Sequence, residues 1–279
     1  MPTVSEIMRY RPSESTHWYK RGTGKPCYTV TKKDGTERPY TLRDAKKYGD
    51  TCPSFSEIEK TYNKQALNMW ITKQHILSAI TLPRIAGETD AELMERIYAD
   101  ARAQQDKAAE RGTQIHAWVQ AGFECELDSE EGMQYFRVAH KAIYGKLTEL
   151  GLPISQFRCE KSFAAEWEDR NVSVNGNWKS YYYGGKCDLH TDMVLIDFKT
   201  TEKPIDTCCL YDNHFRQLAA YKYGLIQNGY LSRDAVCGIC FVNSVTPEAR
   251  LVIANNDDIE RGWGMFRGNL ISWYAEKGL

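Results

Sequence analysis

The stretch Gly184-Gly-Lys-Cys-Asp-Leu-His-Thr-Asp-Met-Val-Leu-Ile-Asp-Phe-Lys199 decides the fold of this chain. Apolar and polar residues alternate on both sides of Thr191-Asp192, which predicts an antiparallel β-hairpin with a two-residue turn. Because side chains alternate between the two faces of a strand, one side of this hairpin points into a core. The residues expected on that side are Val194, Ile196 and Phe198.

The other face of the predicted hairpin gathers charge. With the turn at Thr191-Asp192, Asp188 lies opposite Leu195, and Asp197 and Lys199 share the face of Leu195. Asp188 and Asp197 are then diagonal neighbours, with Cβ atoms roughly 7–8 Å apart or less. Two such carboxylates are costly to hold together without a cation, and their oxygens favour Mg²⁺ or Mn²⁺. The alternative is a surface salt bridge between Lys199 and the two aspartates.

The spacing of apolar residues along the chain predicts an α/β fold with helices in front. The expected helices cover residues 56–80, 90–121 with an interruption near Gly112, 130–150, 206–227 and 258–277. The expected strands cover residues 157–163, 181–190, 193–200, 235–243 and 250–254. We expect a basic N-terminal extension over residues 1–50, a helical region over 51–150 and an α/β core over 151–279.

Composition excludes several classes of protein. The 279 residues include 36 Lys and Arg and 37 Asp and Glu, which argues against a globally basic nucleic-acid binder. No apolar run approaches the roughly 18 residues of a membrane helix, so we expect no membrane partner. Glu6 and Glu14 disfavour a mitochondrial transit peptide, and a cytoplasmic location is expected.

The first fifty residues are locally basic, with eleven Lys or Arg and six Asp or Glu. Asp34-Gly35 predicts a hairpin turn there, and Lys32, Lys33 and Arg38 lie beside it. Basic residues mixed with aromatic ones can bind a phosphate backbone and stack on unpaired bases. These three residues are therefore candidate nucleic-acid contacts. The alternative is a solvated extension whose aromatic residues pack on the body.

The nine cysteines are odd in number and scattered, which indicates a reducing compartment rather than a disulfide framework. Cys237 and Cys240 form a C-x-x-C pair inside an apolar run that predicts a buried strand. No second pair follows them, so we expect buried free thiols. A zinc or iron–sulfur site at this pair is the alternative.

Further motifs surround the hairpin in a defined order. Arg111-Gly-Thr-Gln-Ile-His116 precedes it on a predicted helix, and Glu160 lies on a predicted strand. Gln217 and Tyr221 follow it, four residues apart on one helix face. Together with the Gly-x-x-Asp and Asp-x-Lys sequences of the hairpin, this order resembles the RecB-like branch of the PD-(D/E)XK nuclease superfamily, over about residues 111–221. That branch includes phage, CRISPR-associated and mitochondrial genome maintenance exonucleases.

The resemblance implies a metal site and a catalytic lysine. His116, Asp188 and Asp197 would be metal ligands, and the backbone carbonyl of Phe198 would complete the coordination sphere. Asp188 and Asp197 would also be catalytic, and Lys199 would orient or activate water and stabilise the transition state. One or two Mg²⁺ or Mn²⁺ ions are implied.

The remaining motif residues have supporting roles in the family. Glu160 would be an additional outer ligand or a partner of Lys199. Gln217 and Tyr221 would contact DNA or support the active-site strand; the alternative for Tyr221 is core packing between helix and sheet. Arg111 and Thr113 belong to the helical motif and would bind nucleic acid or support the site.

The family fold is a restriction-endonuclease-like core, a mixed sheet flanked by helices, preceded here by a helical cap. Cys52-Pro-Ser-Phe-Ser-Glu-Ile58 and Leu67-Asn-Met-Trp70 resemble the opening of the phage and mitochondrial members, in which a helical arch passes single-stranded DNA. Gly22-Thr-Gly-Lys25 is not a complete phosphate-binding loop, so no ATP is expected. No iron–sulfur cluster is expected either, because the cysteine pattern of the CRISPR-associated members is missing.

The resemblance implies a metal-dependent DNA exonuclease acting on single-stranded DNA or DNA ends in replication, recombination or repair. Recombination or replication proteins are the implied partners, and a bacterium or a phage-infected host is the implied source. Two alternatives keep the same fold: a structure-selective endonuclease with the same site, and a catalytically silent DNA-binding protein.

Overall fold

The computed structural model describes residues 18–62, 65–153, 155–174 and 177–279. The first 17 residues of the predicted extension, with Glu6 and Glu14, lie outside the described part. In the described part, no helix is both long enough and apolar enough to cross a membrane.

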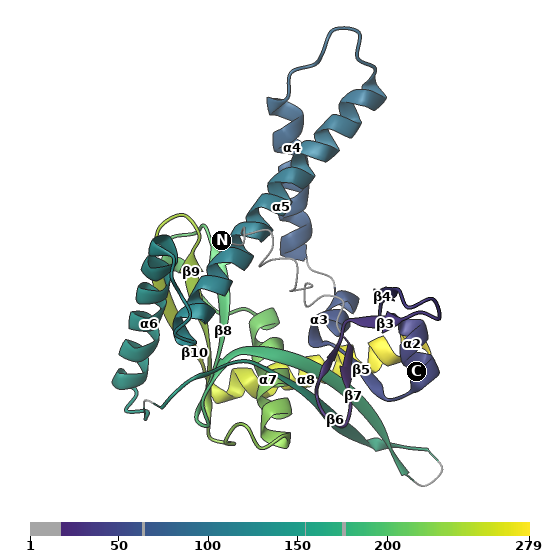
Figure 1. Cartoon of the computed structure of the whole chain (residues 1–279), viewed down its shortest axis with the longest axis vertical. Helices are drawn as coiled ribbons and strands as arrows, with labels where there is room; N and C mark the ends of the chain where they lie inside the picture. Colours follow the sequence, from purple (N-terminus) through teal and green to yellow (C-terminus); the bar gives the residue numbers. More distant parts are fainter. Residues whose placement is uncertain (1–17, 63–64, 154, 175–176) are drawn as a thin grey trace.

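A five-stranded mixed sheet forms the centre of the molecule, in the order β10-β9-β8-β7-β6. Its strands are β6 (Arg158–Val174), β7 (Asn177–His190), β8 (Val194–Thr201), β9 (Val236–Asn243) and β10 (Ala249–Ala254). β8 and β9 pair in parallel, and the other neighbours pair antiparallel. The predicted α/β class is thus confirmed. β6 and β7 are longer than predicted and continue beyond the sheet as a two-stranded ribbon (Figure 1).

The turn between β7 and β8 lies one residue later than predicted. The Thr191 N–H donates to the Val194 carbonyl at 2.9 Å, so Asp192 and Met193 form the turn. The Met193 N–H donates to Thr191 Oγ1 at 3.1 Å. This local side-chain bond stabilises the observed turn over the predicted one.

The later turn shifts the register of the hairpin by two residues. The observed pairs are Leu189 with Ile196 and His190 with Leu195. Because the shift is even, the paired residues keep their predicted faces. Cys187 and Leu189 lie in opposite cores although they are two residues apart, so the alternation of side chains along β7 breaks at Asp188. The pairing ends at Leu189 and Ile196, so Asp188 is not paired with Leu195 as predicted; its Oδ2 instead accepts a hydrogen bond from the Phe198 N–H at 2.8 Å.

Two pairs of helices cover the two faces of the sheet (Figure 1). α5 (Asp90–Phe123) and α6 (Glu130–Glu149) pack on one face, and α7 (Asp212–Gln227) and α8 (Asn256–Lys277) pack on the other. β8 contributes to both cores because its side chains alternate. As predicted, Val194, Ile196 and Phe198 lie in one apolar core, on the α5–α6 face, and Leu195 lies in the core on the α7–α8 face.

Cys237 and Cys240 on β9 are buried free thiols, which confirms that prediction. Their spacing of three places them in opposite cores, Cys237 toward α7 and α8 and Cys240 toward α5 and α6. Burial raises the pKa of each thiol to about 12, so both stay protonated at neutral pH. Two side chains on opposite faces of one strand cannot ligate the same ion.

α4 (Gln65–Thr81) and the first half of α5 form an antiparallel arm that projects from the body (Figure 1). α5 is continuous, so the predicted interruption near Gly112 is wrong. A Cβ atom at Gly112 would lie 2.8 Å from Thr200 Oγ1. Glycine therefore allows α5 to approach β8 closely rather than breaking the helix.

Two other predicted helices begin or end differently. The region predicted as a helix over 56–80 contains α3 (Phe55–Ile58), the 3₁₀ turn η2 (Glu59–Thr61) and α4, because the backbone is extended at Tyr62. The helix predicted from residue 206 begins at Asp212, after the 3₁₀ turn η3 (Ile205–Thr207). The start of α7 is stabilised by His214 Nδ1, which accepts a hydrogen bond from the Tyr211 N–H at 3.1 Å.

Residues 18–53 form small sheets and a helix that pack on the body. β1 (Trp18–Lys20), β2 (Pro26–Cys27) and β5 (Thr51–Pro53) make one sheet, β3 (Thr29–Thr31) and β4 (Glu37–Pro39) make a hairpin, and α2 (Leu42–Tyr48) follows. The β3–β4 turn at Asp34-Gly35 confirms the predicted hairpin. Trp18 packs edge-on against Trp273 of α8, with ring centroids 5.9 Å apart. This segment therefore shares the core on the α7–α8 face.

Candidate metal centre

A pocket of about 410 Å³ lies where α5 crosses the sheet next to β7 and β8. Its polar side chains come from α5, β6, β7 and β8, which carry separate sequence motifs. They are Thr113, His116, Glu160, Lys186, Asp188, Asp197, Lys199 and Thr200, and Phe198 also lines the pocket. The structure thus brings most of the predicted site residues together.

Three residues of this pocket form a group that could hold a metal ion. One ligand atom from each of His116, Glu160 and Asp188 lies within 4.8 Å of the other two. His116 Nε2 lies 3.0 Å from Asp188 Oδ2, and the same oxygen accepts a hydrogen bond from the Phe198 N–H at 2.8 Å. The His116 ring stands edge-on to the Phe198 ring at 5.7 Å, which holds the imidazole in position.

Glu160 reaches the group from an unusual backbone conformation. Its φ angle of 53° lies in the left-handed region, which non-glycine residues rarely adopt. The flanking residues Cys159 and Lys161 remain paired with β7, so the sheet holds this conformation in place. The Glu160 carboxylate forms an ion pair with Lys186 of β7.

Asp197 lies beside this group and is held by two other side chains. Its Oδ1 accepts a hydrogen bond from Gln217 Nε2 of α7 at 2.7 Å, and its Oδ2 lies 2.5 Å from Lys199 Nζ. Asp197 is 2% exposed, whereas the Lys199 side chain is 34% exposed. A buried carboxylate and a half-exposed ammonium therefore share one end of the pocket.

The charged groups of the pocket shift one another's pKa values. Burial disfavours the imidazolium form, but the neighbouring Asp188 carboxylate outweighs it and raises the pKa of His116 to about 9. Burial likewise acts against ionised Asp188, but His116 outweighs it and lowers the pKa of Asp188 to about 2. Burial raises the pKa of Asp197 to about 7, with Lys199 opposing this shift and Asp188 adding to it.

These groups fit a hard divalent cation. Carboxylate oxygens and an imidazole nitrogen form the group, and a cation there would take the place of the proton that His116 holds in the ion pair with Asp188. Such a site would couple metal uptake to proton release.

Gln217 and Tyr221 lie on the same face of α7 but at different depths. Gln217 contacts Asp197 directly. Tyr221 is 1% exposed and packs edge-on against Phe55 and Phe163, with centroids 5.6 Å from each ring. Its surroundings are those of a core residue beneath the sheet.

Arg111 and Thr113 also differ in placement. The Arg111 guanidinium donates to the Ser244 carbonyl at 3.3 Å, to Glu131 at 2.8 Å and to Tyr135 Oη at 2.9 Å. It therefore ties α5 to α6 and to the loop after β9. Thr113 lines the pocket and donates its hydroxyl to the Ala109 carbonyl at 3.0 Å.

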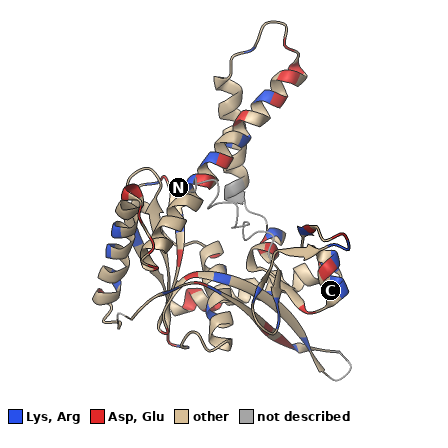
Figure 2. Ribbon diagram, in the orientation of Figure 1, with Lys and Arg blue, Asp and Glu red and all other residues tan. Residues whose placement is uncertain are grey.

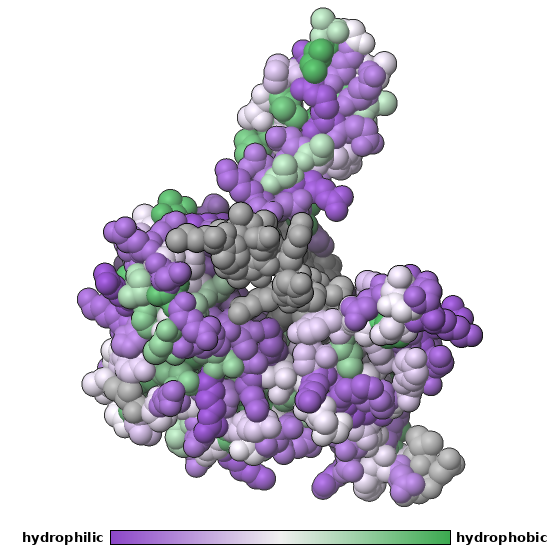
Figure 3. Space-filling view, viewed as in Figure 1, coloured by the Kyte–Doolittle hydropathy of each residue, from purple (hydrophilic) through white to green (hydrophobic). Residues whose placement is uncertain are grey.

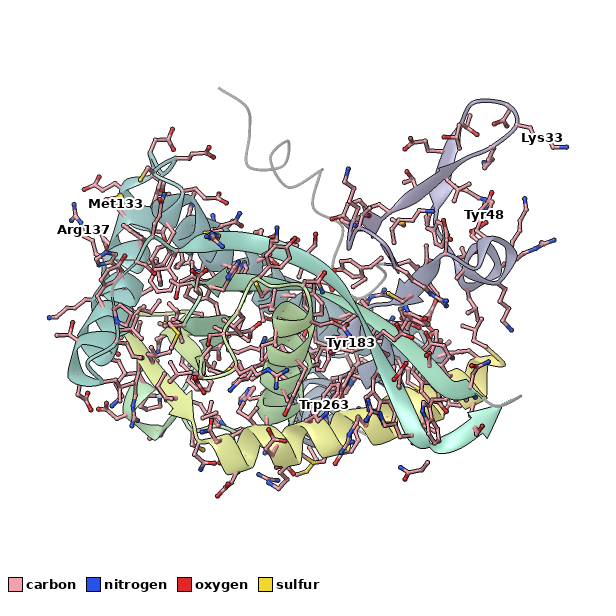
Figure 4. All side chains as sticks on the ribbon, turned by 90° about the horizontal axis from the view of Figure 1, so that it is seen from below. Lys33, Tyr48, Met133, Arg137, Tyr183 and Trp263 are labelled. Atoms are coloured by element: carbon pink, nitrogen blue, oxygen red, sulfur yellow. The ribbon has the colours of Figure 1, made fainter. Side chains whose placement is uncertain are left out.

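The three predicted basic contacts lie at the β3–β4 hairpin and not in the pocket. Lys32 and Lys33 are exposed, and Lys33 points away from the body at the tip of the hairpin (Figure 4). Arg38 forms two hydrogen bonds of 2.6 Å with the carboxylate of Asp44. Its guanidinium is thus already engaged by an anionic partner.

Sequence reasoning missed Lys186. The signal was present, because Lys186 precedes Asp188 by two residues and therefore shares its face of β7. Its importance depends on Glu160, which comes from a strand 26 residues earlier.

Comparisons with known proteins give distant similarities. No protein-family model and no curated protein matches the chain. Among solved structures, a protein of Eubacterium rectale described as a candidate exonuclease is similar with a TM-score of 0.37 and 14% identity, over 60% of this chain and 68% of that one. A protein called SSO0001 is similar with a TM-score of 0.30 and 12% identity, over 72% of this chain and 86% of that one. Structural similarities this distant do not assign a function, so the functional proposal rests on the site itself.

Proposed function

We propose that this chain is a divalent-metal-dependent DNA exonuclease with a site and core of the PD-(D/E)XK type. The observation that carries the proposal is the convergence of the His116, Glu160 and Asp188 group with Asp197 and Lys199 in one pocket. A salt-bridge cluster without a metal would not require a histidine within ligand distance of two carboxylates.

Mg²⁺ or Mn²⁺ is the cation that we assign to the pocket. His116, Glu160 and Asp188 would hold it, and Asp197 and the Phe198 carbonyl are the further ligands that we propose. A bound cation of this kind activates water and neutralises the charge that develops on a phosphate during displacement. Glu160 thus takes a larger role here than the outer ligand that the resemblance implies.

Lys199 is the residue that we assign to the scissile phosphate. Asp197 holds its ammonium at one end of the pocket, and its side chain is exposed enough to reach a bound strand. There it would donate hydrogen bonds to a phosphate oxygen or to the attacking water. Gln217 would keep Asp197 in the orientation that this requires.

Single strands or DNA ends are the substrates that the pocket favours. A pocket of about 410 Å³ under α5 admits one strand more easily than a duplex. The pocket lies at the base of the arm, so we propose that the entering strand passes there, flanked by the base of the helical region 51–150. Lys32 and Lys33 would add phosphate contacts from the N-terminal segment, where Arg38 supports the hairpin.

The test is cleavage of end-labelled linear single-stranded DNA and of circular single-stranded DNA, each with Mg²⁺, Mn²⁺ or EDTA. We expect degradation of the linear substrate alone, and none in EDTA. Lys199→Ala and Asp188→Asn should each lower the rate at least about 100-fold with an unchanged circular dichroism spectrum. Lys203→Ala, an exposed lysine near by, is the matched control and should cleave normally.

Two other outcomes of this experiment would identify a different activity, and a third would contradict the proposal. Cleavage of circular DNA would identify an endonuclease. Metal-independent DNA binding without cleavage would identify a silent binding protein, and unchanged rates in both site variants would contradict the assigned centre.

A further inference from the structure

The arm presents an apolar face to solvent. On α4 the exposed large residues are Met69, Trp70, Ile76, Leu77 and Ile80, with Ile80 75% exposed and Met69 61% exposed. At 100° per residue they fall within an arc of about 120°, as a seam for another helix does. The arm accordingly shows hydrophobic patches on its surface in Figure 3. We call these five residues the α4 stripe.

The opposite side of α4 is the one that packs on α5, and it is the more polar one. Ser78 is buried there, and its hydroxyl donates to Asp100 at 2.8 Å. His75 packs edge-on against Tyr98 at 5.0 Å. An amphipathic helix normally buries its apolar face, so the arm of a single chain leaves that face without a partner within the described residues.

The apolar surface area that the arm exposes is as large as one side of a protein–protein interface. Taking about 200 Å² for a fully exposed large residue, the α4 stripe exposes on the order of 500 Å². Ile85, Met94 and Tyr98 of the same arm are each more than half exposed, and with them the arm exposes about 900 Å² of large apolar residues, comparable to one side of a standard interface. Tyr98 lies beside His75 and is not part of the α4 stripe. Soluble monomers rarely expose contiguous patches of more than a few hundred Å².

We propose that the α4 stripe docks against the arm of a second copy of this chain, so that two arms form a four-helix bundle. This inference does not depend on the nuclease assignment, because no residue of the stripe lines the pocket. The repeat Met69–Ile76 and Trp70–Leu77 has the seven-residue period of antiparallel and parallel helix seams. A second copy supplies a seam of the same length and period.

The charges of the arm also fit a second copy better than DNA. Lys73 lies within the stripe and is the one ionic side chain of α4, whereas the part of α5 in the arm, residues 90–110, carries six acidic and three basic residues. Figure 2 shows these charges along the arm. The arm is therefore net negative, which repels phosphate, while Lys73 of one copy can pair with the acidic α5 of the other.

The test is the molar mass of the full chain by light scattering after size exclusion, over a range of concentrations. We expect a dimer of twice 32.0 kDa. The double substitution I76E/I80E should give a monomer with an unchanged circular dichroism spectrum, and its melting temperature should no longer rise with protein concentration as that of the dimer does. Val245→Glu, at an equally exposed apolar residue in the loop after β9, is the matched control and should stay dimeric.

Three outcomes would overturn the proposal. A wild-type monomer at every concentration excludes the dimer, and an I76E/I80E dimer places the interface elsewhere. If the wild type is monomeric and I76E/I80E loses affinity for a single-stranded oligonucleotide, the stripe belongs to DNA binding. None of these outcomes bears on metal-dependent cleavage, which is measured separately.

Discussion

Asp197 shows how single residues prepare the candidate centre. Its carboxylate is nearly inaccessible and is oriented by Gln217 from α7 and by Lys199 from its own strand. The spacing in the sequence correctly paired Asp197 with Lys199 on one face of β8. The hydrogen bond from Gln217 depends on how α7 packs under the sheet, which spacing within one segment does not reveal.

Gln217→Leu tests this orientation. The substitution keeps the volume of the side chain and removes its hydrogen bond to Asp197. Residues that orient ligands typically change metal affinity by about 10–100-fold, so we expect a loss of this size in Mn²⁺ affinity by calorimetric titration. Gln227→Leu, farther along α7 and bonded to Glu166, is the control and should bind Mn²⁺ normally. Equal Mn²⁺ affinity in the Gln217→Leu variant and the wild type would show that Gln217 does not orient a metal ligand.

At the scale of elements, the approach of α5 to β8 places His116 over the sheet. Gly112 permits this approach one turn before His116. In sequence, Gly112 suggested a helix interruption because glycine lowers helix propensity. A glycine in a helix can either weaken the helix or allow another element to approach closely. Which of these applies depends on the residue that faces the glycine, here Thr200, which is 88 residues away in the chain.

Gly112→Ala tests the contact. The new methyl group would lie 2.8 Å from Thr200 Oγ1. The clash costs about 1–3 kcal/mol and alanine gains up to about 1 kcal/mol in helix propensity, so we expect the free energy of unfolding in urea to fall by about 1–2 kcal/mol. Gly145→Ala on α6 is the control. It meets no atom within 4 Å and should raise stability by up to about 1 kcal/mol through helix propensity. Adding Thr200→Ala should restore the first variant, and failure to do so would assign its loss to another contact.

The hydrogen bond of His214 at the start of α7 should make the stability of the chain depend on pH. His214 must be neutral to accept the Tyr211 N–H, and burial lowers the pKa of His214 from 6.5 to about 4. Between these values the unfolded chain binds more protons than the folded one, so stability rises with pH across this window and is fully present above it. The contribution is about 3 kcal/mol. Unfolding of His214→Gln should depend less on pH from 4 to 6.5; an identical pH profile would contradict this role.

At the scale of the whole molecule, one buried ion pair joins segments that are 157 residues apart. Glu59 of η2 accepts hydrogen bonds from Arg216 of α7 at 2.9–3.0 Å and from Asn269 of α8 at 2.9 Å. Arg216 is 2% exposed and Glu59 is 4% exposed. This pair docks the chain segment before the arm onto the helices on the far side of the sheet.

Glu59→Gln should leave a buried guanidinium without its counter-charge. We expect a loss of about 3–5 kcal/mol in the free energy of unfolding, measured in urea. The control is Glu149→Gln, which removes an exposed pair with Lys146 and should cost at most about 1 kcal/mol. Similar losses in the two variants would show that the Glu59 pair contributes no more than a surface contact.

Local pattern was enough for the α/β class, most strands, the β3–β4 turn and the faces of β8, because these follow from the period of side chains along short segments. Asp197 and Lys199 could be paired for the same reason, whereas His116 was predicted from the resemblance of the motif order to a known family. The β7–β8 turn was predicted one residue early, although the bond that stabilises it is local. The unbroken α5, the Glu160–Lys186 pair and the choice between the two roles considered for Tyr221 could not be predicted. Each of these depends on contacts between segments distant in the chain, and their energies appear in no single segment.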